Sequence, residues 1–242
     1  MPAEHDGLQP SRVGHSWDGD YETREYSPVY VPLWRMLEAF LGNAPSETVL
    51  DFGCGDGTYA RLMGEKGRQV TGIDISERAI KKAETRKCEK CIFIRCDCIP
   101  NDLPGDSFDV VVALNSLHCL THDQRAGLYE QIRRVLKPNG YFFASVLSIV
   151  DESYPRREWR EIAPGTFVDG DGKLFHFFTE SELANELSWL ETREIGKLQN
   201  IHPGCGRKSA LFVVAAQYPG PVKPEDVASK KTTLTRSERI RP

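Results

Sequence analysis

Five short apolar runs recur along residues 48–148, and segments with a helical spacing of apolar positions separate them. Within each run apolar residues follow one another, which is typical of a strand that is covered on both faces of its sheet. The pattern therefore predicts five buried strands, at residues 48–52, 69–74, 91–97, 108–114 and 141–148.

Three of the intervening segments predict helices. Residues 58–67 directly follow a glycine-rich stretch, and residues 76–87 begin with Ser76, a favourable N-cap. Residues 122–137 repeat apolar positions at helical spacing. Because strands and helices alternate, we expect a parallel sheet with right-handed crossover connections.

The C-terminal part of the chain predicts one more helix and a pair of strands. The helix is expected at residues 179–188 and the strands at residues 190–198 and 210–217, with only IHPGCGRK (201–208) between the strands. Such a short connection makes a hairpin, so the last strand should run antiparallel. The expected fold is α/β: a doubly wound, mostly parallel seven-stranded sheet with an antiparallel final strand and helices on both faces.

The two ends of the chain differ from its middle. Residues 1–20 are polar without periodicity, and residues 219–242 mix prolines, small polar residues and charges. Neither end has an apolar face to bury. We therefore expect a flexible N-terminal segment and a flexible tail around one domain at residues 21–218.

Composition and charge narrow the choice of partners. The 242-residue chain has a formal net charge of -4, so no overall positive field attracts nucleic acid, and we expect no DNA partner. No apolar run approaches the roughly 20 residues of a membrane span, and no apolar signal lies at the N-terminus. We expect no membrane partner and a cytoplasmic location, while the sequence leaves the oligomeric state open.

The stretch DFGCGDG (51–57) falls at the carboxyl end of the first predicted strand, where open α/β sheets bind ligands. Its glycines are spaced GxGxG rather than the GxGxxG of dinucleotide sites, and two aspartates would repel a pyrophosphate. No GKS or GKT follows, which excludes a P-loop. The loop favours a ligand that lies close to the backbone, carries no phosphate and tolerates negative charge.

Five stretches, in order over about residues 45–150, resemble the motifs of the class I S-adenosylmethionine-dependent methyltransferases. They are VLDFGCGDG (49–57), QVTGIDIS (69–76), IRCDCIP (94–100), FDVVVALNSLHCL (108–120) and RVLKPNGYFF (134–143). The resemblance implies S-adenosyl-L-methionine as cofactor. It also implies an enzyme that moves a methyl group by in-line displacement.

The resemblance assigns cofactor binding to nine residues: Asp51, Gly53, Cys54, Gly55, Asp74, Ile75, Asp97, Cys98 and Asn115. Asp74 ends the second predicted strand, so its two oxygens can accept from both ribose hydroxyls. Asp97 is expected to accept from the adenine amino group, with the backbone of Cys98 completing that edge. Gly53 and Gly55 have no Cβ, so their backbone can lie against the methionine part.

Two polar residues, Asp51 and Asn115, are expected around the methionine part of the cofactor. Asp51 would polarise the contacts to the ammonium group, and Asn115 would approach through its carbonyl just after the fourth strand. Asp56 has a rival interpretation, because aspartate is a favoured N-cap and the next helix begins near Gly57.

The acceptor is harder to infer than the cofactor. After the fourth strand the chain reads Asn-Ser-Leu-His (115–118), whereas enzymes acting on amide or adenine nitrogens have Asn or Asp followed by Pro-Pro and an aromatic residue. The Pro-Cys pair of cytosine-C5 enzymes is also absent from the sequence. We expect a small-molecule acceptor. The alternatives are a protein or RNA methyltransferase, or a non-catalytic S-adenosylmethionine-binding scaffold.

Three segments outside the motifs are expected to form a lid: residues 21–40, 149–178 and 200–208. Residues 149–178 are long for a mere connection. The aromatic candidates for acceptor contacts are Trp17, Tyr21, Tyr26 and Trp159. The alternative is that these rings only anchor the lid.

Three histidines are candidates for a catalytic base: His118, His176 and His202. A neutral imidazole with a pKa near its usual value of about 6.5 could take a proton from the acceptor as the methyl group arrives. The alternative is that the rings pack or face water, because thiolate or metalloid acceptors need no base.

Four cysteines fall in the stretch CEKCIFIRCDC (88–98). Cys88 and Cys91 have a CxxC spacing typical of metal sites, with Cys96 and Cys98 close behind. If residues 91–98 continue one strand, however, alternation sends Cys91 to one face and the last two thiols to the other. We therefore expect reduced structural thiols and no metal site.

Overall fold

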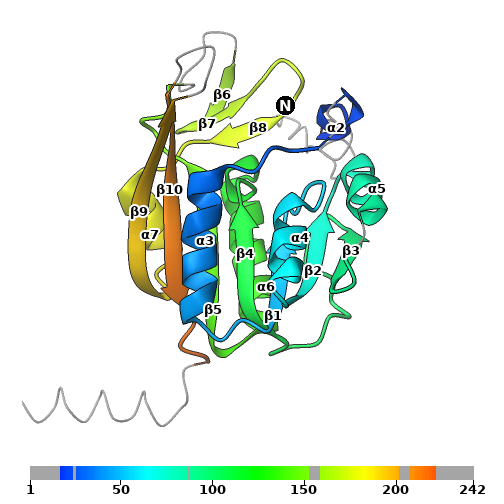
Figure 1. The fold of residues 1–242 in the computed structure, drawn as a ribbon. Helices are drawn as coiled ribbons and strands as arrows, with labels where there is room; N and C mark the ends of the chain where they lie inside the picture. Colours follow the sequence, from blue (N-terminus) through cyan, green and yellow to red (C-terminus); the bar gives the residue numbers. More distant parts are fainter. Residues whose placement is uncertain (1–16, 24–25, 87, 153–158, 202–207, 222–242) are drawn as a thin grey trace, which may run out of the picture.

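The computed structural model describes residues 17–23, 26–86, 88–152, 159–201 and 208–221. Its centre is a seven-stranded sheet in the order β3-β2-β1-β4-β5-β10-β9 (Figure 1). The strands are β1 (Thr48–Phe52), β2 (Gln69–Asp74), β3 (Cys91–Arg95), β4 (Phe108–Leu114), β5 (Leu136–Leu147), β9 (Glu191–Ile201) and β10 (Lys208–Gln217). The strand order reverses at β1 and β4, which places a topological switch point there.

The pairing of the strands confirms the expected topology. β1 pairs parallel with β2 and β4, β2 pairs parallel with β3, and β4 pairs parallel with β5. β10 pairs antiparallel with both β5 and β9, so β9 runs with the parallel strands and only the last strand is reversed. The fold is therefore the doubly wound, mostly parallel seven-stranded sheet that the hydrophobic pattern predicts.

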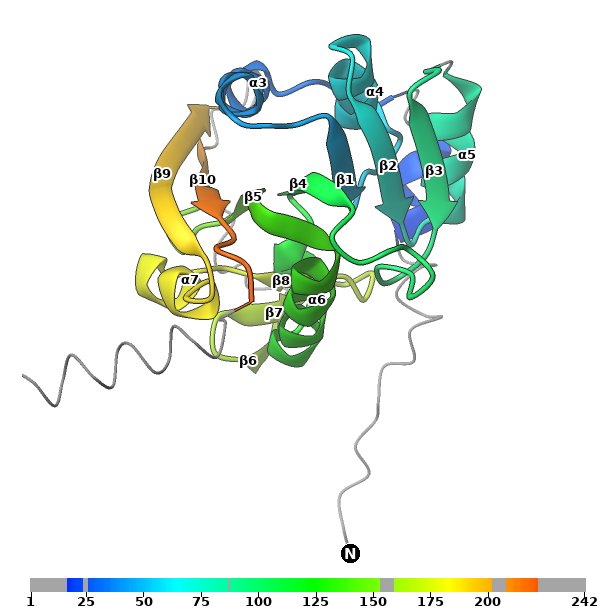
Figure 2. The ribbon, with the colours of Figure 1, turned by 90° about the horizontal axis from the view of Figure 1, so that it is seen from below.

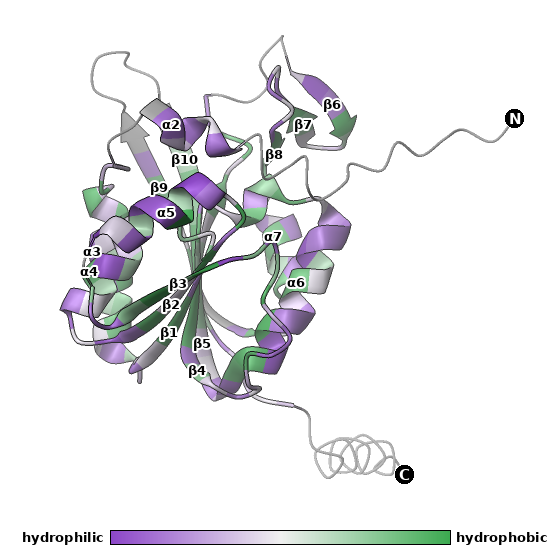
Figure 3. Cartoon of the chain, turned by 90° about the vertical axis from the view of Figure 1, so that its right-hand side faces the viewer, coloured by the Kyte–Doolittle hydropathy of each residue, from purple (hydrophilic) through white to green (hydrophobic). Residues whose placement is uncertain are grey.

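Helices cover both faces of this sheet (Figures 2 and 3). One face carries α3 (Val31–Asn43), α4 (Thr58–Glu65) and α5 (Glu77–Thr85), and the other carries α6 (His122–Val135) and α7 (Glu180–Glu186). Each face of the sheet has its own apolar core. Leu37 and Met63 are buried in the core under α3 and α4, and Ile132 and Leu183 are buried in the core under α6 and α7. Hydrophobic strands between helices with polar outer faces are visible in Figure 3. No helix in the described ranges is long and apolar enough to cross a membrane.

The N-terminal segment differs from the expected lid at residues 21–40. Its second half is helix α3, whose Leu33, Leu37 and Leu41 are buried against the sheet. Only the short helix α2 (Asp20–Thr23) lies over the carboxyl edge of the sheet (Figure 1). The repeat of leucine every four residues is a helix pattern, and it is the signal that identifies α3 as a core helix.

Residues 149–178 contain a second, smaller sheet. Its strands β6 (Arg160–Ala163), β7 (Thr166–Val168) and β8 (Leu174–His176) pair antiparallel in that order. The small sheet lies above the carboxyl ends of the parallel strands, on the same side as α2 (Figure 1). Strands of three or four residues carry too short an alternation to be predicted from sequence.

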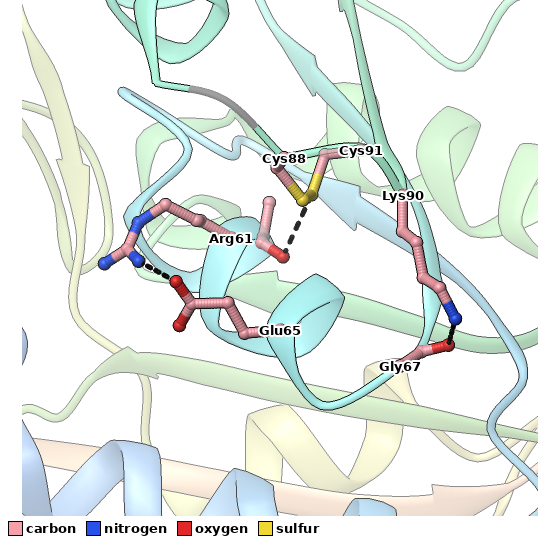
Figure 4. Close-up of a disulfide and its surroundings, with 7 residues drawn as sticks. Arg61, Glu65, Gly67, Cys88, Lys90 and Cys91 are labelled. Carbon is pink, nitrogen blue, oxygen red and sulfur yellow. Dashed lines mark hydrogen bonds and ion pairs between the residues drawn. A yellow bond between two sulfur atoms is a disulfide. The ribbon is translucent and has the colours of Figure 1, made fainter.

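Cys88 and Cys91 form a disulfide, which corrects the expectation that the thiols are reduced (Figure 4). The bond lies at the start of β3 and packs on α4, where Cys91 Sγ is 3.5 Å from the Ala60 carbonyl oxygen. A Cβ on Gly64 would meet Cys88 Sγ at 2.5 Å, so the disulfide fills the space beside this helix. The CxxC spacing therefore serves here as a covalent link between the two cysteines.

Candidate functional site

A pocket opens at the carboxyl ends of β1, β2, β3 and β4, beneath α2. Its wall consists of Trp17, Tyr21, Phe52, Gly53, Ile73, Asp74, Ile75, Cys96, Asp97, Asn115, Ser116, Cys119 and Leu120. Seven of these are residues that the sequence predicts for a ligand site: Trp17, Tyr21, Gly53, Asp74, Ile75, Asp97 and Asn115. Strands far apart in the sequence thus bring the expected residues to one place at the switch point.

The glycine loop presents bare backbone to this pocket. Gly53 and Gly55 have φ angles of 73° and 55°, in the left-handed region that favours glycine. A Cβ on Gly53 would lie 2.4 Å from the Cβ of Ser116, and a Cβ on Gly55 would lie 2.6 Å from Tyr21 Oη. The loop can therefore approach its neighbours, or a ligand, more closely than any residue with a side chain would allow.

Asp74 ties the glycine loop to the end of β2. Its Oδ2 accepts from the Gly55 N–H at 2.8 Å, and its Oδ1 accepts from the Ser76 N–H at 2.8 Å. Burial raises the pKa of Asp74, whereas these two hydrogen bonds lower it. Each carboxylate oxygen has a further lone pair, so both can still accept from a ligand in the pocket.

Asp51 is a buried carboxyl group with an unsatisfied oxygen. It is 2% exposed, and its Oδ2 has no hydrogen-bond partner within the described part of the chain. Burial, followed by the charge of Asp74, raises the pKa of Asp51 from 3.8 to about 7. A buried acceptor without a partner is costly. Its place at the end of β1 therefore fits a ligand that brings a cationic donor.

Asn115 and Ser116 shape the opposite wall at the end of β4. Asn115 has a φ of 53°, and its side-chain Oδ1 accepts from Ser145 Oγ at 3.1 Å. Ser116 Oγ donates to the Phe52 carbonyl at 3.0 Å and so joins β1 to the segment after β4. These bonds hold the wall in one conformation.

Asp56 connects the loop to the N-terminal segment. Its carboxylate accepts from the backbone N–H of Ser27, and from the N–H of Thr58 at 3.3 Å and Thr58 Oγ1 at 2.8 Å. Thr58 is the first residue of α4, so Asp56 satisfies a free N–H at the start of this helix. The rival interpretation of Asp56 as a capping residue agrees with these contacts, although Gly57 holds the N-cap position itself.

The segment around α2 is fastened over the pocket from two sides. Asp18 Oδ1 accepts from Ser76 Oγ at 2.5 Å and from the Arg78 N–H at 3.2 Å. On the other side, Lys173 Nζ donates to Asp20 Oδ1 at 2.5 Å. Lys173 is largely buried, and it lies 5.4 Å from the ring centroid of Trp17. We call the Asp20–Lys173 ion pair the clamp.

Tyr21 extends from α2 into the pocket. Its hydroxyl lies close to Gly55, and burial, followed by the charge of Asp74, raises its pKa. Tyr21 is therefore a neutral phenol that can donate one hydrogen bond. Together with Trp17 it closes the pocket on the side of α2.

Tyr26 and Trp159 contact other parts of the protein. Tyr26 Oη is 3.1 Å from Thr85 Oγ1, and the Arg86 guanidinium lies 3.9 Å from its ring centroid. Trp159 stacks on Phe175 of β8, with ring centroids 4.8 Å apart. Neither ring belongs to the pocket wall, so both agree with the alternative in which aromatic residues anchor the surrounding segments.

Two of the three candidate histidines, His118 and His176, lie in the described ranges, and both are buried outside the pocket wall. His118 has a pKa lowered to about 3, by burial and then by His176, so its ring is neutral. Both ring nitrogens of His176 are occupied, by Thr166 Oγ1 at 2.7 Å and Glu182 Oε1 at 2.9 Å. These contacts give His176 a structural position rather than access to an acceptor. His202 lies outside the described residues, as do residues 202–207 of the expected segment 200–208.

A buried ion-pair network contacts the pocket wall at Leu120. The sequence contains no indication of this network. Arg125 is 1% exposed; its Nη2 donates to Glu186 Oε1 at 2.6 Å and its Nη1 donates to the Leu120 carbonyl at 2.7 Å. Tyr129 Oη donates to the same Glu186 at 2.9 Å. Because Leu120 lines the pocket, Arg125 links α6 and α7 to the pocket wall. An arginine in the polar first turn of an amphipathic helix gives no signal that it is buried.

Of the remaining predicted residues, Asp51, Cys54, Gly55 and Cys98 lie close in the sequence to residues of the pocket wall but are not part of it. Burial raises the pKa of the Cys54 thiol well above its usual range. Cys98 lies 3.6 Å from Cys96, measured between the Sγ atoms. β3 ends at Arg95, so strand alternation does not apply to these two thiols.

Comparison with known proteins agrees with this geometry. Residues 49–140 match the family model described as a methyltransferase domain. The chain is 32% identical over 136 residues to a ubiquinone biosynthesis O-methyltransferase from Idiomarina loihiensis, covering 54% of this chain and 55% of that protein. It is 33% identical over 133 residues to a 27-O-demethylrifamycin SV methyltransferase from Amycolatopsis mediterranei, covering 51% and 46%. The chain thus spans about half the length of the curated relatives it matches.

A solved S-adenosylmethionine-dependent methyltransferase from Methanosarcina mazei shares the fold over nearly its whole length. The TM-score is 0.65 at 25% identity, and the match covers 77% of this chain and 98% of that one. The matched family model spans β1 to the start of β5, and this part supplies all residues of the pocket wall except Trp17 and Tyr21. Residues 49–140 therefore match a methyltransferase domain, and the chain shares the fold of this S-adenosylmethionine-dependent methyltransferase.

Proposed function

We propose that this protein transfers a methyl group from S-adenosyl-L-methionine to a small-molecule acceptor. One observation supports the proposal most directly: Asp51, buried with an unsatisfied oxygen, lies at the end of β1 where the glycine loop begins. The two-point acceptor Asp74 ends the neighbouring strand β2. The cofactor offers a matching ammonium group, a compact methionine part and two ribose hydroxyls. The residues of the pocket therefore fit it.

The binding roles follow from position in the pocket wall and, for Asp51 and Gly55, from the segment 51–55 that contains Gly53 of this wall. Asp51 would accept from the ammonium group, and the backbone at Gly53 and Gly55 would lie against the methionine part. Asp74 would accept from the ribose hydroxyls. Asp97, two residues after the end of β3, would accept from the adenine amino group.

Methyl transfer requires mainly that the acceptor atom is aligned with the methyl group of the cofactor. The cofactor, when bound, supplies an already activated methyl group. This chain would hold the acceptor in line with that group and exclude water, and such positioning can lower a barrier by roughly 7–11 kcal/mol. Trp17 and Tyr21 close the pocket on one side and Asn115 and Leu120 form another wall, so they are the residues placed to exclude water.

The class of the acceptor is inferred from the pocket and from the relatives. The wall beyond Asp74 is largely apolar and aromatic, which suits a small organic molecule. The names of two relatives, a ubiquinone biosynthesis O-methyltransferase and a 27-O-demethylrifamycin SV methyltransferase, describe methylation of small molecules. Both observations support a small-molecule acceptor for this chain.

Transfer of labelled methyl groups tests the proposed reaction. The protein is incubated with methyl-labelled S-adenosylmethionine and a cell extract separated into small molecules, protein and RNA. We expect the label in the small-molecule fraction and S-adenosylhomocysteine as the second product. Label in protein or RNA would instead support a macromolecular acceptor, and tight cofactor binding without turnover in any fraction would support the scaffold.

Replacement of Asp74 by alanine is expected to weaken cofactor binding at least tenfold. The variant loses both acceptor oxygens for the ribose, and a hydrogen bond to a charged group contributes about 1.5–3 kcal/mol. Calorimetric titration with S-adenosylhomocysteine measures the change. Glu77→Ala, an exposed carboxylate on the neighbouring helix α5, is the control and should bind as the parent protein does. Unchanged affinity in a folded Asp74→Ala protein would rule out the ribose contact.

Breaking the clamp is expected to weaken cofactor binding about threefold to tenfold. Lys173→Glu places a like charge against Asp20. Asp20 directly precedes Tyr21 in α2, so α2 should move away from the pocket more often. The pair is only partly buried, which limits the effect to about 1 kcal/mol. The measurement is the dissociation rate of S-adenosylhomocysteine.

The doubly reversed variant, Asp20→Lys with Lys173→Glu, separates the clamp from simple destabilisation. It restores attraction between the two side chains and should recover most of the lost affinity. Glu130→Lys, which places a like charge against Arg133 in an exposed pair on α6, is the remote control for Lys173→Glu and should leave cofactor affinity unchanged. A double variant as weak as Lys173→Glu alone would contradict the role of the clamp.

A further inference from the structure

Three potential metal ligands converge directly after β3. The Sγ atoms of Cys96 and Cys98 are 3.6 Å apart, and Cys96 Sγ is 4.0 Å from Asp97 Oδ1. The ligand atoms of all three residues lie within 4.8 Å of one another. The two thiols are partly buried and the carboxylate is exposed, so solvent reaches the group through Asp97.

The spacing of the two thiols matches the bite of a tetrahedral metal ion. Two sulfurs bound at about 2.3 Å with a tetrahedral angle between them lie about 3.8 Å apart. A disulfide would need about 2.05 Å. The observed 3.6 Å between the Cys96 and Cys98 sulfurs is therefore close to the separation that one shared zinc-like ion requires.

The backbone around the three ligands is fixed at both ends. The Cys96 N–H donates to the Asp74 carbonyl at 3.0 Å, which continues the pairing of β3 with β2. The Ile99 N–H donates to Gln131 Oε1 of α6 at 2.9 Å. A short segment pinned at both ends is preorganised, so little conformational entropy is lost when it binds an ion.

We propose that Cys96, Asp97 and Cys98 bind one thiophilic divalent cation of the zinc class. Two thiolates and one carboxylate oxygen supply three ligands, and water fills the fourth position. Each thiol loses its proton to solvent when its sulfur bonds to the ion. Binding therefore releases two protons per cation without any oxidation or reduction, and the affinity rises with pH.

Charged groups around the site include Asp74 of β2 and Arg95 of β3, which is held by Glu77 of α5. The sequence predicts no metal site, because alternation along a single strand at residues 91–98 would separate the thiols. In the structure β3 ends at Arg95, so strand alternation does not apply to Cys96 and Cys98.

The cation should compete with the cofactor, an expectation that rests on the proposed function. Cys96 and Asp97 both line the pocket, and Asp97 is the proposed acceptor for the adenine amino group. A cation bound to the Asp97 carboxylate would prevent it from accepting the hydrogen bond of the adenine amino group. By linkage, each ligand then lowers the affinity for the other by the same factor.

Titration of the full-length protein with zinc, against a chromophoric chelator, tests the site. We expect one zinc per chain and the release of two protons, measured by calorimetry in buffers of different ionisation enthalpy. Cys96→Ser and Cys98→Ser should each lower the affinity about a hundredfold, and Asp97→Asn should lower it less. Cys119→Ser removes another thiol of the same pocket and should bind zinc as the parent does.

The rival ligands are Cys88 and Cys91, which have the other metal-like spacing and form a disulfide in the structure. Zinc binding that survives Cys96→Ser and Cys98→Ser but disappears in Cys88→Ser would overturn the proposal, as would the absence of stoichiometric binding. S-adenosylhomocysteine titrated with and without zinc tests the competition separately. Zinc bound at Cys96 and Cys98 with unchanged cofactor affinity would leave the site standing and contradict only the competition.

Discussion

Asp51→Asn is expected to change the pH dependence of stability by on the order of 4 kcal/mol while weakening cofactor binding. In the unliganded protein, burial raises the pKa of Asp51 from 3.8 to about 7. A group with a raised folded-state pKa binds its proton more tightly in the folded state. The folded protein therefore loses stability as the pH rises from about 4 to about 7, because the buried carboxyl group must ionise.

Asparagine at position 51 has the shape of aspartate and cannot ionise. The unfolding free energy of the variant, relative to the parent, should therefore increase between about pH 4 and about pH 8, by roughly 1.36 kcal/mol for each unit of the pKa shift. Denaturant unfolding at several pH values measures this difference. A constant offset between the two proteins over that range would show that Asp51 does not titrate in this way.

The same variant should bind S-adenosylhomocysteine about ten- to a hundredfold more weakly at about pH 8. A charged hydrogen bond to the ammonium group contributes about 1.5–3 kcal/mol, and the amide oxygen of asparagine carries no charge. In the parent protein the affinity should rise as Asp51 ionises around pH 7. An equal affinity of parent and variant would remove Asp51 from the cofactor site.

Arg125→Leu is expected to destabilise the fold by about 3–5 kcal/mol, because it leaves a buried carboxylate without its partner. Glu186 accepts hydrogen bonds from Arg125 and Tyr129, and its side chain is 9% exposed. Burial alone would raise the pKa of Glu186, but the hydrogen bonds and the charge of Arg125 lower it. Equilibrium unfolding by denaturant measures the decrease in the free energy of unfolding.

The double variant Arg125→Leu with Glu186→Leu is the matched control. Replacing a buried ion pair by apolar residues of similar volume is often close to neutral, so the double variant should be clearly more stable than the single one. The carbonyl of Leu120 loses its donor in both, and the pocket wall should loosen equally. If single and double variants are equally unstable, the cost comes from lost packing around Arg125 rather than from an unpaired charge.

The core of the fold could be predicted from sequence because its signals are local and repeated. Strands such as 108–114 are continuous apolar runs, and the helix of residues 122–135 has a helical apolar repeat. The short connection after β9 correctly indicated an antiparallel last strand. Each of these signals depends on a few neighbouring residues and on burial, which the hydrophobic pattern reports directly.

The parts that escaped prediction depend on contacts between distant residues. Asp20 and Lys173 are 153 positions apart, and Arg125 and Glu186 are 61 apart, so no local pattern links them. The short strands β6 to β8 give no clear alternation. The sequence predicts that Gly53, Asp74, Asp97 and Asn115 lie together, because parallel strands end at the same edge of a sheet. No comparable rule predicts the position of the histidines.

Titration with S-adenosylhomocysteine, with NADH as the comparison, tests the central claim that this pocket holds a methyl-donor cofactor rather than a dinucleotide. The account predicts a rise in thermal stability with S-adenosylhomocysteine, about 2.7 kcal/mol at 100 times its dissociation constant, and no rise with NADH. The rise should be lost when Gly55 is replaced by valine, whose side chain would occupy the space beside Tyr21 Oη. Stabilisation by NADH alone would contradict the account.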